Sequence, residues 1–259
     1  MQFFDDLKGK RAVVTGACGV VGRGIVETLR GAGCHLCLTD TAQAPLEAFR
    51  LTGESFAETA ELTSAESIEA LGAEIGKRWG AADILVNNAG IYPSGFLLDI
   101  SIEEYDRIFD INLRAPFILT RRIATQMIQK KVKGSIINIS SGASRKMRST
   151  VVPYCTSKTA LDRLTKGFAV ELAEFGIRVN ALEPGFAPGS TVSELTSEHI
   201  TNTIAAIPMG RQSSHEDVGN GILYLASDAS SYVTGATLTI DGGNSIGSTA
   251  VHQAKKKPL

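Results

Sequence analysis

The sequence has few cysteines, almost no net charge and no long hydrophobic run. Four cysteines in 259 residues are too few for a disulfide framework and are typical of a reducing compartment, which predicts a cytoplasmic protein. Lys and Arg number 26 against 27 Asp and Glu, so no basic field attracts nucleic acid or an anionic membrane. No apolar run approaches the ~20 residues of a membrane span, and residues 1–10 do not resemble a signal peptide. We therefore expect neither a nucleic-acid nor a membrane partner.

The spacing typical of metal ligands is absent as well. Cys34 and Cys37 form a CxxC, but no second pair follows, and residues three apart in a strand point to opposite faces. We therefore predict that both cysteines are buried in the core. The four histidines are scattered along the chain, which predicts no metal site: His35, His199, His215 and His252.

Short apolar runs alternate with helical patterns along the chain, and this alternation predicts an α/β fold with a parallel sheet. Hydrophobic residues make up 43% and charged residues 20%, as in a folded globular protein. The seven predicted strands are residues 11–15, 35–39, 55–62, 83–87, 135–139, 178–182 and 236–240. The predicted helices are residues 21–31, 44–51, 64–79, 102–131, 154–175, 193–205 and 215–226.

No linker or change in composition divides these elements, so we expect one domain over residues 1–243. Residues 244–259 are small and polar and lead into three lysines, Lys255 to Lys257. Such a stretch predicts a C-terminal tail that is disordered or docked on a partner.

A glycine-rich turn follows the first strand, in the sequence TGACGVVG of residues 15–22. Between a strand and a helix, such a turn brings backbone N–H groups and a helix N-terminus to a pyrophosphate, which predicts a dinucleotide site. The second strand ends at Asp40, whose carboxylate can accept hydrogen bonds from a ribose and would repel a 2′-phosphate. This favours NAD over NADP. The alternative is that Asp40 is an ordinary loop acid that caps the next helix.

Three further segments complete a pattern. They are VNNAG (residues 86–90), INISS (137–141) and YCTSK (154–158). Together with the turn at Thr15, they resemble the short-chain dehydrogenase/reductase superfamily in its short, single-domain form, over residues 7–243. The resemblance implies a Rossmann-like, doubly wound fold with a seven-stranded parallel sheet and helices on both faces. It also implies a homotetramer.

The resemblance assigns roles to residues of this chain. It implies that Tyr154 is the catalytic acid/base, Lys158 its electrostatic partner, Ser141 the residue that orients the substrate oxygen, and Asn112 a member of a proton relay. The implied cofactor-binding residues are Gly16, Gly19, Val21, Gly22, Asp40, Glu61, Leu62, Asn88, Ala89, Gly90, Tyr154, Lys158, Pro184, Gly185 and Ala187.

Physical chemistry supports the catalytic roles independently. Tyr154 and Lys158 are four residues apart on a helical pattern, so they share a face, and an ammonium group there would lower the pKa of the phenol. The Ser141 hydroxyl would stabilise charge that develops on the substrate oxygen. Asn112 lies within a long helical pattern, where asparagine is mildly unfavourable, and this cost indicates a function.

Two positions depart from the superfamily pattern. Val20 stands where the common short form has glycine, and the glycine lies one residue earlier, at Gly19. Gly189 replaces a threonine that many members place near the cofactor carboxamide. These departures predict a changed phosphate loop and a shifted or lost contact at the nicotinamide.

Substrate specificity should come from loops beyond the carboxyl ends of the strands, at residues 91–96, 142–153 and 186–209. Tyr92, Phe96 and Met147 could line a small apolar pocket or could be packing residues. The middle loop contains three cations that could bind a carboxylate or phosphate: Arg145, Lys146 and Arg148. A solvated basic loop, or an interface, is the favoured alternative.

We therefore predict an NAD-dependent dehydrogenase that acts on a secondary alcohol, of the polyol, sugar or hydroxy acid type. One alternative is an NADPH-dependent ketoreductase, such as a 3-oxoacyl carrier-protein reductase, and Asp40 argues against it. A second alternative is a nucleotide-binding module without catalysis. The full set of Asn112, Ser141, Tyr154 and Lys158 argues against that module.

Overall fold

Seven strands form one sheet in the order β3-β2-β1-β4-β5-β6-β7, and every neighbouring pair is parallel. The computed structural model describes residues 4–189 and 195–247. The strands are β1 (Arg11–Thr15), β2 (His35–Thr39), β3 (Phe56–Ala57), β4 (Ile84–Asn87), β5 (Ser135–Ile139), β6 (Arg178–Pro184) and β7 (Thr237–Ile240). The predicted seven-stranded, Rossmann-like α/β fold is confirmed.

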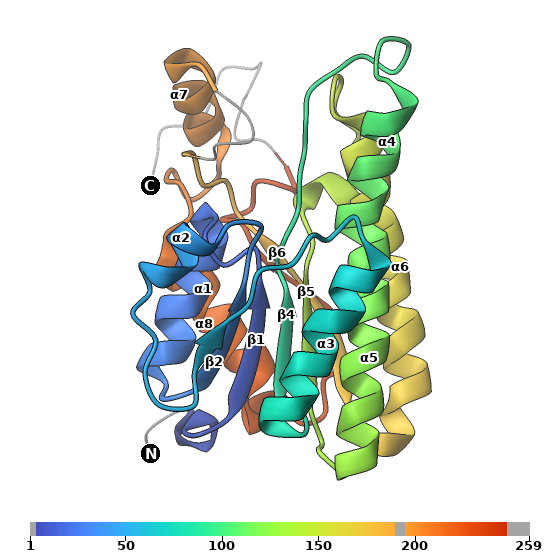
Figure 1. The fold of residues 1–259 in the computed structure, drawn as a ribbon. Coiled ribbons are helices and arrows are strands. Elements are labelled where there is room, and N and C mark those ends of the chain that lie inside the picture. Colours follow the sequence, from blue (N-terminus) through green and yellow to red (C-terminus); the bar gives the residue numbers. More distant parts are fainter. Residues whose placement is uncertain (1–3, 190–194, 248–259) are drawn as a thin grey trace, which may run out of the picture.

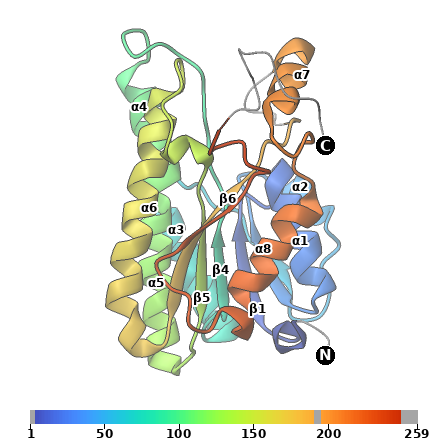
Figure 2. The same ribbon diagram turned by 180° about the vertical axis from the view of Figure 1, so that it is seen from behind.

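Helices cover both faces of the sheet (Figures 1 and 2). On one face lie α1 (Val20–Gly31) and α8 (His215–Ala226), and on the other lie α3 (Ala65–Trp79), α5 (Ala115–Lys130) and α6 (Val152–Leu172). Strand residues alternate between the two layers, because Val13 packs with α3 and α5 whereas Ala12 and Val14 pack with α1. Cys34 and Cys37 are buried in opposite layers, as predicted.

The chain changes direction between β1 and β4, the point where the order of the strands reverses. In folds of this kind ligands bind outside the carboxyl ends of the strands at that point. Figure 1 shows this edge of the sheet at the top, with the loops after β4 and β6 rising beside it.

The largest differences from the predicted boundaries lie at β3 and at α2 (Gln43–Glu47). Strand β3 has only two residues, although the N–H groups of Glu58 and Ala60 continue to bond to carbonyl groups at the end of β2. α2 is shorter than predicted, because the chain turns at Arg50, whose φ is +47°. The remaining strand ends agree with the prediction to within two residues.

The helix predicted over residues 102–131 is divided in three. It comprises α4 (Ile102–Phe109), a π-helical segment (Asp110–Arg114) and α5. The Ala115 N–H donates to the carbonyl of Asp110, five residues earlier. In a regular α-helix it would donate to the residue four positions earlier. Pro116 has no N–H to offer Asn112, so a regular α-helix would lose a bond there.

Two predicted segments extend beyond the described residues. α7 (Ser197–Ala206) begins later than the predicted helix 193–205, whose first two residues lie outside the described part. Of the predicted tail, residues 248–259 lie outside the described part, whereas Asn244 and Ser245 contact the loop after β5. No helix in the described ranges combines the length and apolar character that crossing a membrane requires.

Candidate active site

Glycines shape the turn between β1 and α1 by letting the chain pack closely on itself. Gly16 has a φ of +62°, and a Cβ there would lie 2.8 Å from the Cα of Ala89. A Cβ on Gly22 would lie 2.1 Å from the Gly16 carbonyl oxygen. α1 begins after Gly19, with no side-chain cap and no acid in its first turn. Its free N–H groups and positive dipole end fit the pyrophosphate of a dinucleotide.

Asn88 and Thr15 hold this turn against the segment that follows β4. The Thr15 hydroxyl accepts hydrogen bonds from the N–H groups of Asn88 and Ala89, each at 3.0 Å. The Asn88 amide nitrogen donates to the carbonyl groups of Thr15 and Gly16, each at 2.9 Å. Both donors of that amide are therefore used in joining the ends of β1 and β4.

Asp40 lies at the carboxyl end of β2, facing the glycine turn. Its Oδ2 accepts a hydrogen bond from the Cys18 N–H, and its Oδ1 accepts one from the Thr41 N–H, each at 2.9 Å. Both oxygens keep acceptor capacity for a ribose hydroxyl. Asp40 does not cap α2, whose N-cap is Ala42, so the helix-cap alternative is wrong. Burial and the charge of Asp40 raise the pKa of Cys18 to about 11, so this thiol is protonated at neutral pH.

Three of the predicted cofactor-binding side chains make contacts within the protein. Val21 and Leu62 each pack against one of the two core layers. Glu61 is exposed, and its Oε1 accepts hydrogen bonds from the N–H and the hydroxyl of Thr63. The side chains of these three residues therefore have partners within the protein.

The segment after β6 closes the other end of the predicted cofactor site. Pro184 is the last residue of β6, and a Cβ on Gly185 would lie 3.0 Å from both the Cα of Asp241 and the Cβ of Ser213. This close approach requires glycine. Ala187, two residues further on, is partly exposed.

Tyr154 and Lys158 lie one turn apart in α6, beside the end of β5. The Lys158 side chain is buried, and its Nζ donates to the Ile139 carbonyl at 2.8 Å and lies 5.8 Å from the centre of the Tyr154 ring. Ser141 follows β5, and its hydroxyl lies close enough to Tyr154 to lower the pKa of that phenol. The three predicted catalytic groups therefore meet at the carboxyl edge of the sheet.

The pKa values of this cluster differ from the sequence-based expectation. Burial raises the pKa of Tyr154 to about 12, and the neighbouring Ser141 hydroxyl and the positive charge of Arg148 oppose that rise. Burial also lowers the pKa of Lys158 to about 8. The expected lowering of the Tyr154 pKa by Lys158 is wrong, because burial of the phenol has the largest effect and raises its pKa.

Asn112 lies in the π-helical segment and is fully buried. Its Oδ1 accepts from the Ile91 N–H at 2.9 Å, and its Nδ2 donates to the Ile91 carbonyl at 2.8 Å and to the Ser157 hydroxyl at 3.1 Å. A Cβ on Gly90 would lie 3.4 Å from both the Asn112 Oδ1 and the Lys158 Nζ. The structure thus brings Gly90, Asn112 and Lys158 together.

Sequence reasoning missed Glu183, a fully buried carboxylate in β6. It accepts hydrogen bonds from the hydroxyls of Ser144, at 3.1 Å, and Thr239, at 2.8 Å, and forms an ion pair with Arg145. The available signal was an acidic residue inside a buried apolar run. The cluster joins the loop after Ser141 to β6 and β7.

The two departures from the superfamily pattern face each other in space. A Cβ built on Gly189 would lie 4.0 Å from the Cγ2 of Val20, and Gly189 has a φ of +103°. Val20 is the first residue of α1, so its side chain lies beside the segment after β6.

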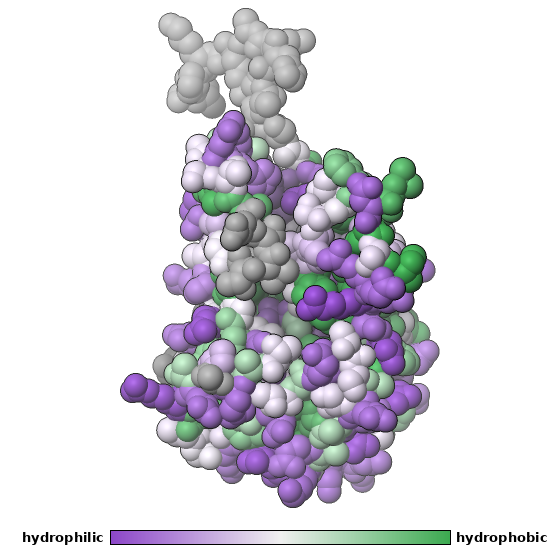
Figure 3. Space-filling model, turned by 45° about the horizontal axis from the view of Figure 1, so that its top comes forward, coloured by the Kyte–Doolittle hydropathy of each residue, from purple (hydrophilic) through white to green (hydrophobic). Residues whose placement is uncertain are grey.

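The mouth of the site is apolar on the side of α4. Tyr92 lies at the catalytic centre, with its ring centre 5.5 Å from that of Tyr154. Phe96 and Met147 are 61% and 65% exposed, so neither is buried as packing. Leu98 is also fully exposed, and Figure 3 shows hydrophobic side chains standing out at this rim.

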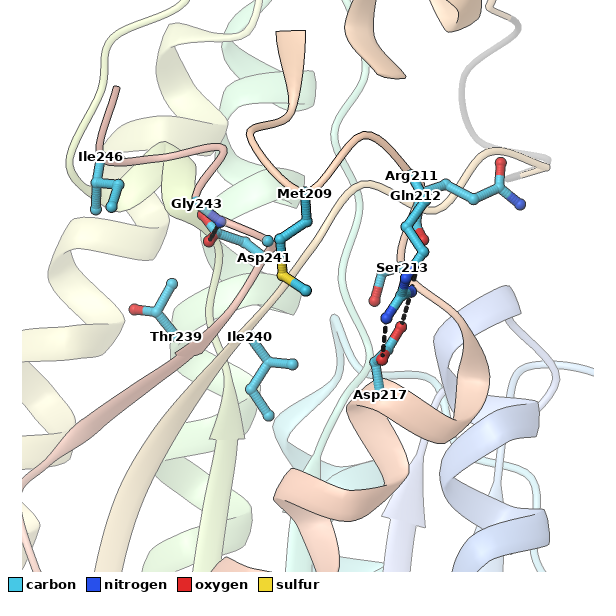
Figure 4. A pocket seen from close by; sticks show the side chains of 11 residues that line it. Met209, Arg211, Gln212, Ser213, Asp217, Thr239, Ile240, Asp241, Gly243 and Ile246 are labelled. Carbon is cyan, nitrogen blue, oxygen red and sulfur yellow. Dashed lines mark hydrogen bonds and ion pairs between the residues drawn. The ribbon is translucent and has the colours of Figure 1, made fainter. Parts of the chain in front are cut away.

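A cavity of about 590 Å³ lies beside the site, between the segment before α8, the first turn of α8 and the end of β7 (Figure 4). Arg211 and Asp217 form a bidentate ion pair in its wall, and this pair holds the pKa of Asp217 well below its usual range. None of the four predicted catalytic residues lines this cavity, so we do not equate it with the reaction centre. It borders the segment predicted to hold the nicotinamide, because Ser213 and Asp241 line its wall and also lie beside Gly185.

Comparison with known proteins agrees with this geometry. Residues 16–245 match a family model described as enoyl-(acyl carrier protein) reductase. The chain is 36% identical to 3-oxoacyl-[acyl-carrier-protein] reductase FabG of Rickettsia bellii, over 92% of this chain and 98% of that protein. No cluster of metal-binding side chains occurs among the described residues.

Solved structures resemble the chain over nearly its whole length. A short-chain type dehydrogenase/reductase from Mycobacterium marinum has a TM-score of 0.87 and 33% identity, and the match covers 94% of this chain and 98% of that one. A gluconate 5-dehydrogenase from Burkholderia cenocepacia, in complex with NADP and tartrate, has a TM-score of 0.86 and 28% identity, with 96% and 99% covered.

Proposed function

The chain belongs to the short-chain dehydrogenase/reductase superfamily, and we propose that it interconverts a ketone and a secondary alcohol with a nicotinamide dinucleotide. The observation that carries this proposal is the meeting of Tyr154, Ser141 and Lys158 at the carboxyl edge of the sheet, beside the glycine turn. Such a constellation has no use in a module that only binds nucleotide. The curated relative is named as a ketoreductase, so ketone reduction is supported at least as well as polyol oxidation.

Each catalytic residue has a defined task in this proposal. The nicotinamide, when bound, supplies or accepts the hydride. Tyr154 donates its proton to the ketone oxygen in reduction and takes it back in oxidation. Because its pKa is raised to about 12, the phenol carries that proton at neutral pH, as reduction requires. Ser141 donates a hydrogen bond to the same oxygen. Lys158 would hold the nicotinamide ribose, and Asn112 fixes Ile91 at the edge of the site.

Replacing Tyr154 tests this mechanism. Tyr154→Phe removes only the hydroxyl, so NAD(P)H should bind with near-native affinity while turnover falls by about 10² to 10⁴. Tyr224→Phe is the matched control and should keep native turnover, because it removes a hydroxyl from α8, on the other face of the sheet from α6. Steady-state nicotinamide absorbance and a fluorescence titration of NAD(P)H measure the two effects. Native turnover in Tyr154→Phe would contradict the proposal.

We also propose that the chain prefers NAD(H) to NADP(H). Asp40 supports this, because its carboxylate faces the turn at the expected adenosine ribose and a 2′-phosphate would add a like charge beside it. The NADP in the Burkholderia structure belongs to that relative.

Removal of the Asp40 charge tests the preference. Asp40→Asn should shift the ratio of the NADH and NADPH dissociation constants about tenfold or more towards NADPH, since ~1.4 kcal/mol corresponds to a tenfold change. Glu47→Gln, an exposed acid on α2, removes the same charge without this effect. A wild-type protein that binds NADPH more tightly than NADH would refute the preference and leave the catalytic proposal intact.

A further inference from the structure

The loop between Ser141 and Tyr154 has three cations, and the structure uses two of them internally. The Arg145 guanidinium is paired with Glu183 and also donates to the hydroxyls of Thr239 and Ser245. The Lys146 Nζ donates to the Asn244 carbonyl at 3.0 Å. Glu183 therefore neutralises Arg145, and Lys146 is bound to the backbone beside β7, so we take Arg148 as the candidate ligand of the three.

Arg148 is exposed, and its side chain has no hydrogen-bonding or ion-pair partner among the residues that the structure describes. Its backbone, in contrast, is fixed. The Val151 N–H bonds to the Arg148 carbonyl across a tight turn that contains Thr150, which has a φ of +67°. A β-branched residue is costly in this left-handed conformation. The cost is compatible with a backbone that is held in place for a function.

The turn lies beside the reaction centre. The Thr150 carbonyl accepts a hydrogen bond from the Gly95 N–H at 2.7 Å, and Gly95 follows Tyr92, whose ring packs against Tyr154. Arg148 is also close enough for its charge to lower the pKa of Tyr154. An anion bound to Arg148 would therefore lie near the substrate carbon whose oxygen exchanges a proton with Tyr154.

The position of this charge separates two substrate classes. A keto or hydroxy acid has its carboxylate a few bonds from the reacting carbon. A carrier-bound acyl thioester is neutral there, because its nearest charge is the distant phosphate of the carrier arm. Guanidinium groups bind carboxylates with two parallel hydrogen bonds, which gives both affinity and orientation.

We propose that Arg148 binds a substrate carboxylate close to the carbon that exchanges hydride, so that the protein acts on keto and hydroxy acids in preference to their neutral esters and thioesters. This inference rests on the proposed ketone–alcohol activity. It names Arg148 as the residue that determines specificity.

The test compares a free acid with its neutral analogues. Acetoacetate, methyl acetoacetate and the N-acetylcysteamine thioester of acetoacetate are assayed with NADH on the wild type and on Arg148→Gln. We expect the variant to lower kcat/KM for the acid by about 10- to 100-fold, mainly through KM, because it loses the charge-assisted hydrogen bonds to the carboxylate. The neutral compounds should change less than about twofold. NADH affinity should not change.

Lys146→Gln is the matched control, because it removes one positive charge from the same loop. It should leave the preference for the acid unaltered. If both variants lowered kcat/KM for the acid equally, the effect would come from the summed positive charge of the loop. That result would overturn the assignment of Arg148. A wild type that reduces the ester or thioester faster than the acid would also overturn the inference, while the proposed activity would stand.

A lack of turnover with all three compounds would count against the proposed activity. The inference is then tested by binding. In the presence of NADH, acetoacetate should raise the melting temperature of the wild type and not that of Arg148→Gln. The same rise in both proteins would refute the carboxylate site, and so would no rise in the wild type.

Discussion

The residue with the most unusual surroundings is Lys158, an ammonium group in the buried wall of the site. It is 4% exposed, has one hydrogen bond, to the Ile139 carbonyl, and its pKa is lowered by burial to about 8. Between that value and the ordinary 10.5, the unfolded chain binds a proton that the folded chain has released. Burial of the charged Lys158 ammonium group therefore lowers the free energy of unfolding at neutral pH. This loss becomes smaller as the pH rises from about 8 towards 10.5.

This sign gives a prediction for Lys158→Met. At pH 7 the variant no longer buries the charge. Between pH 7 and 9.5 the free energy of unfolding of the wild type should rise relative to the variant by about 2 kcal/mol. Urea unfolding of both proteins across this range measures the difference, from which the other titrating groups cancel. Lys166→Met, on the exposed side of the same helix, should show no pH-dependent difference. A constant difference between the wild type and Lys158→Met would contradict the lowered pKa.

Residue spacing predicted the sequence-local part of the site and missed its long-range part. The resemblance to the superfamily assigned Tyr154 and Lys158, and their separation of four residues correctly predicted that they share one face of a helix. The pairing of Arg145 with Glu183 joins residues 38 positions apart, and no local pattern specifies it. For the same reason the sequence left three cations open as anion ligands. Only the structure shows that Arg145 and Lys146 have partners within the protein, which leaves Arg148 as the candidate ligand.

At the scale of elements, the buried strands were the easiest to predict. β1, β2 and β5 begin and end at the predicted residues, because each is an apolar run buried on both faces and bounded by polar or glycine residues. β3 lies at the edge of the sheet and pairs with β2 through two residues only, so little burial specifies its length.

The π-helical segment could not be predicted from hydrophobic periodicity, because α4 and α5 continue nearly the same pattern on either side of it. Its local signals were Pro116 and Asn112. Proline removes the donor that Asn112 would use in a regular helix, and the wider turn places the Asn112 side chain against Ile91. Asparagine is unfavourable inside a helix, but here its side chain fixes the edge of the site. We therefore attribute the presence of Asn112 to function.

At the scale of the whole molecule, the outer surface of α5 and α6 carries exposed apolar side chains. We call the exposed Phe117, Val170 and Phe175, the last of them just after α6, together with the partly buried Phe168, the outer patch. Val170 is 79% exposed, and the rings of Phe117 and Phe168 lie 5.9 Å apart across the two helices. Figure 1 shows these helices side by side along one edge of the molecule. Exposed apolar groups of this kind are typical of a surface that another chain covers.

The outer patch supports the expected homotetramer, which stays a prediction. Light scattering coupled to size exclusion should give four times the 27.5 kDa mass of one chain for the wild type. Val170→Asp should lower that mass, because two-fold contacts would place the introduced carboxylates near each other in an apolar interface. Leu98→Asp, a matched change at a fully exposed residue near the mouth of the site, should leave the mass unchanged. A monomeric wild type at micromolar concentration would refute the tetramer. Equal masses for the wild type and Val170→Asp would show that the interface lies elsewhere. An interface that buried residue 170 could not accept a carboxylate there without loss of assembly.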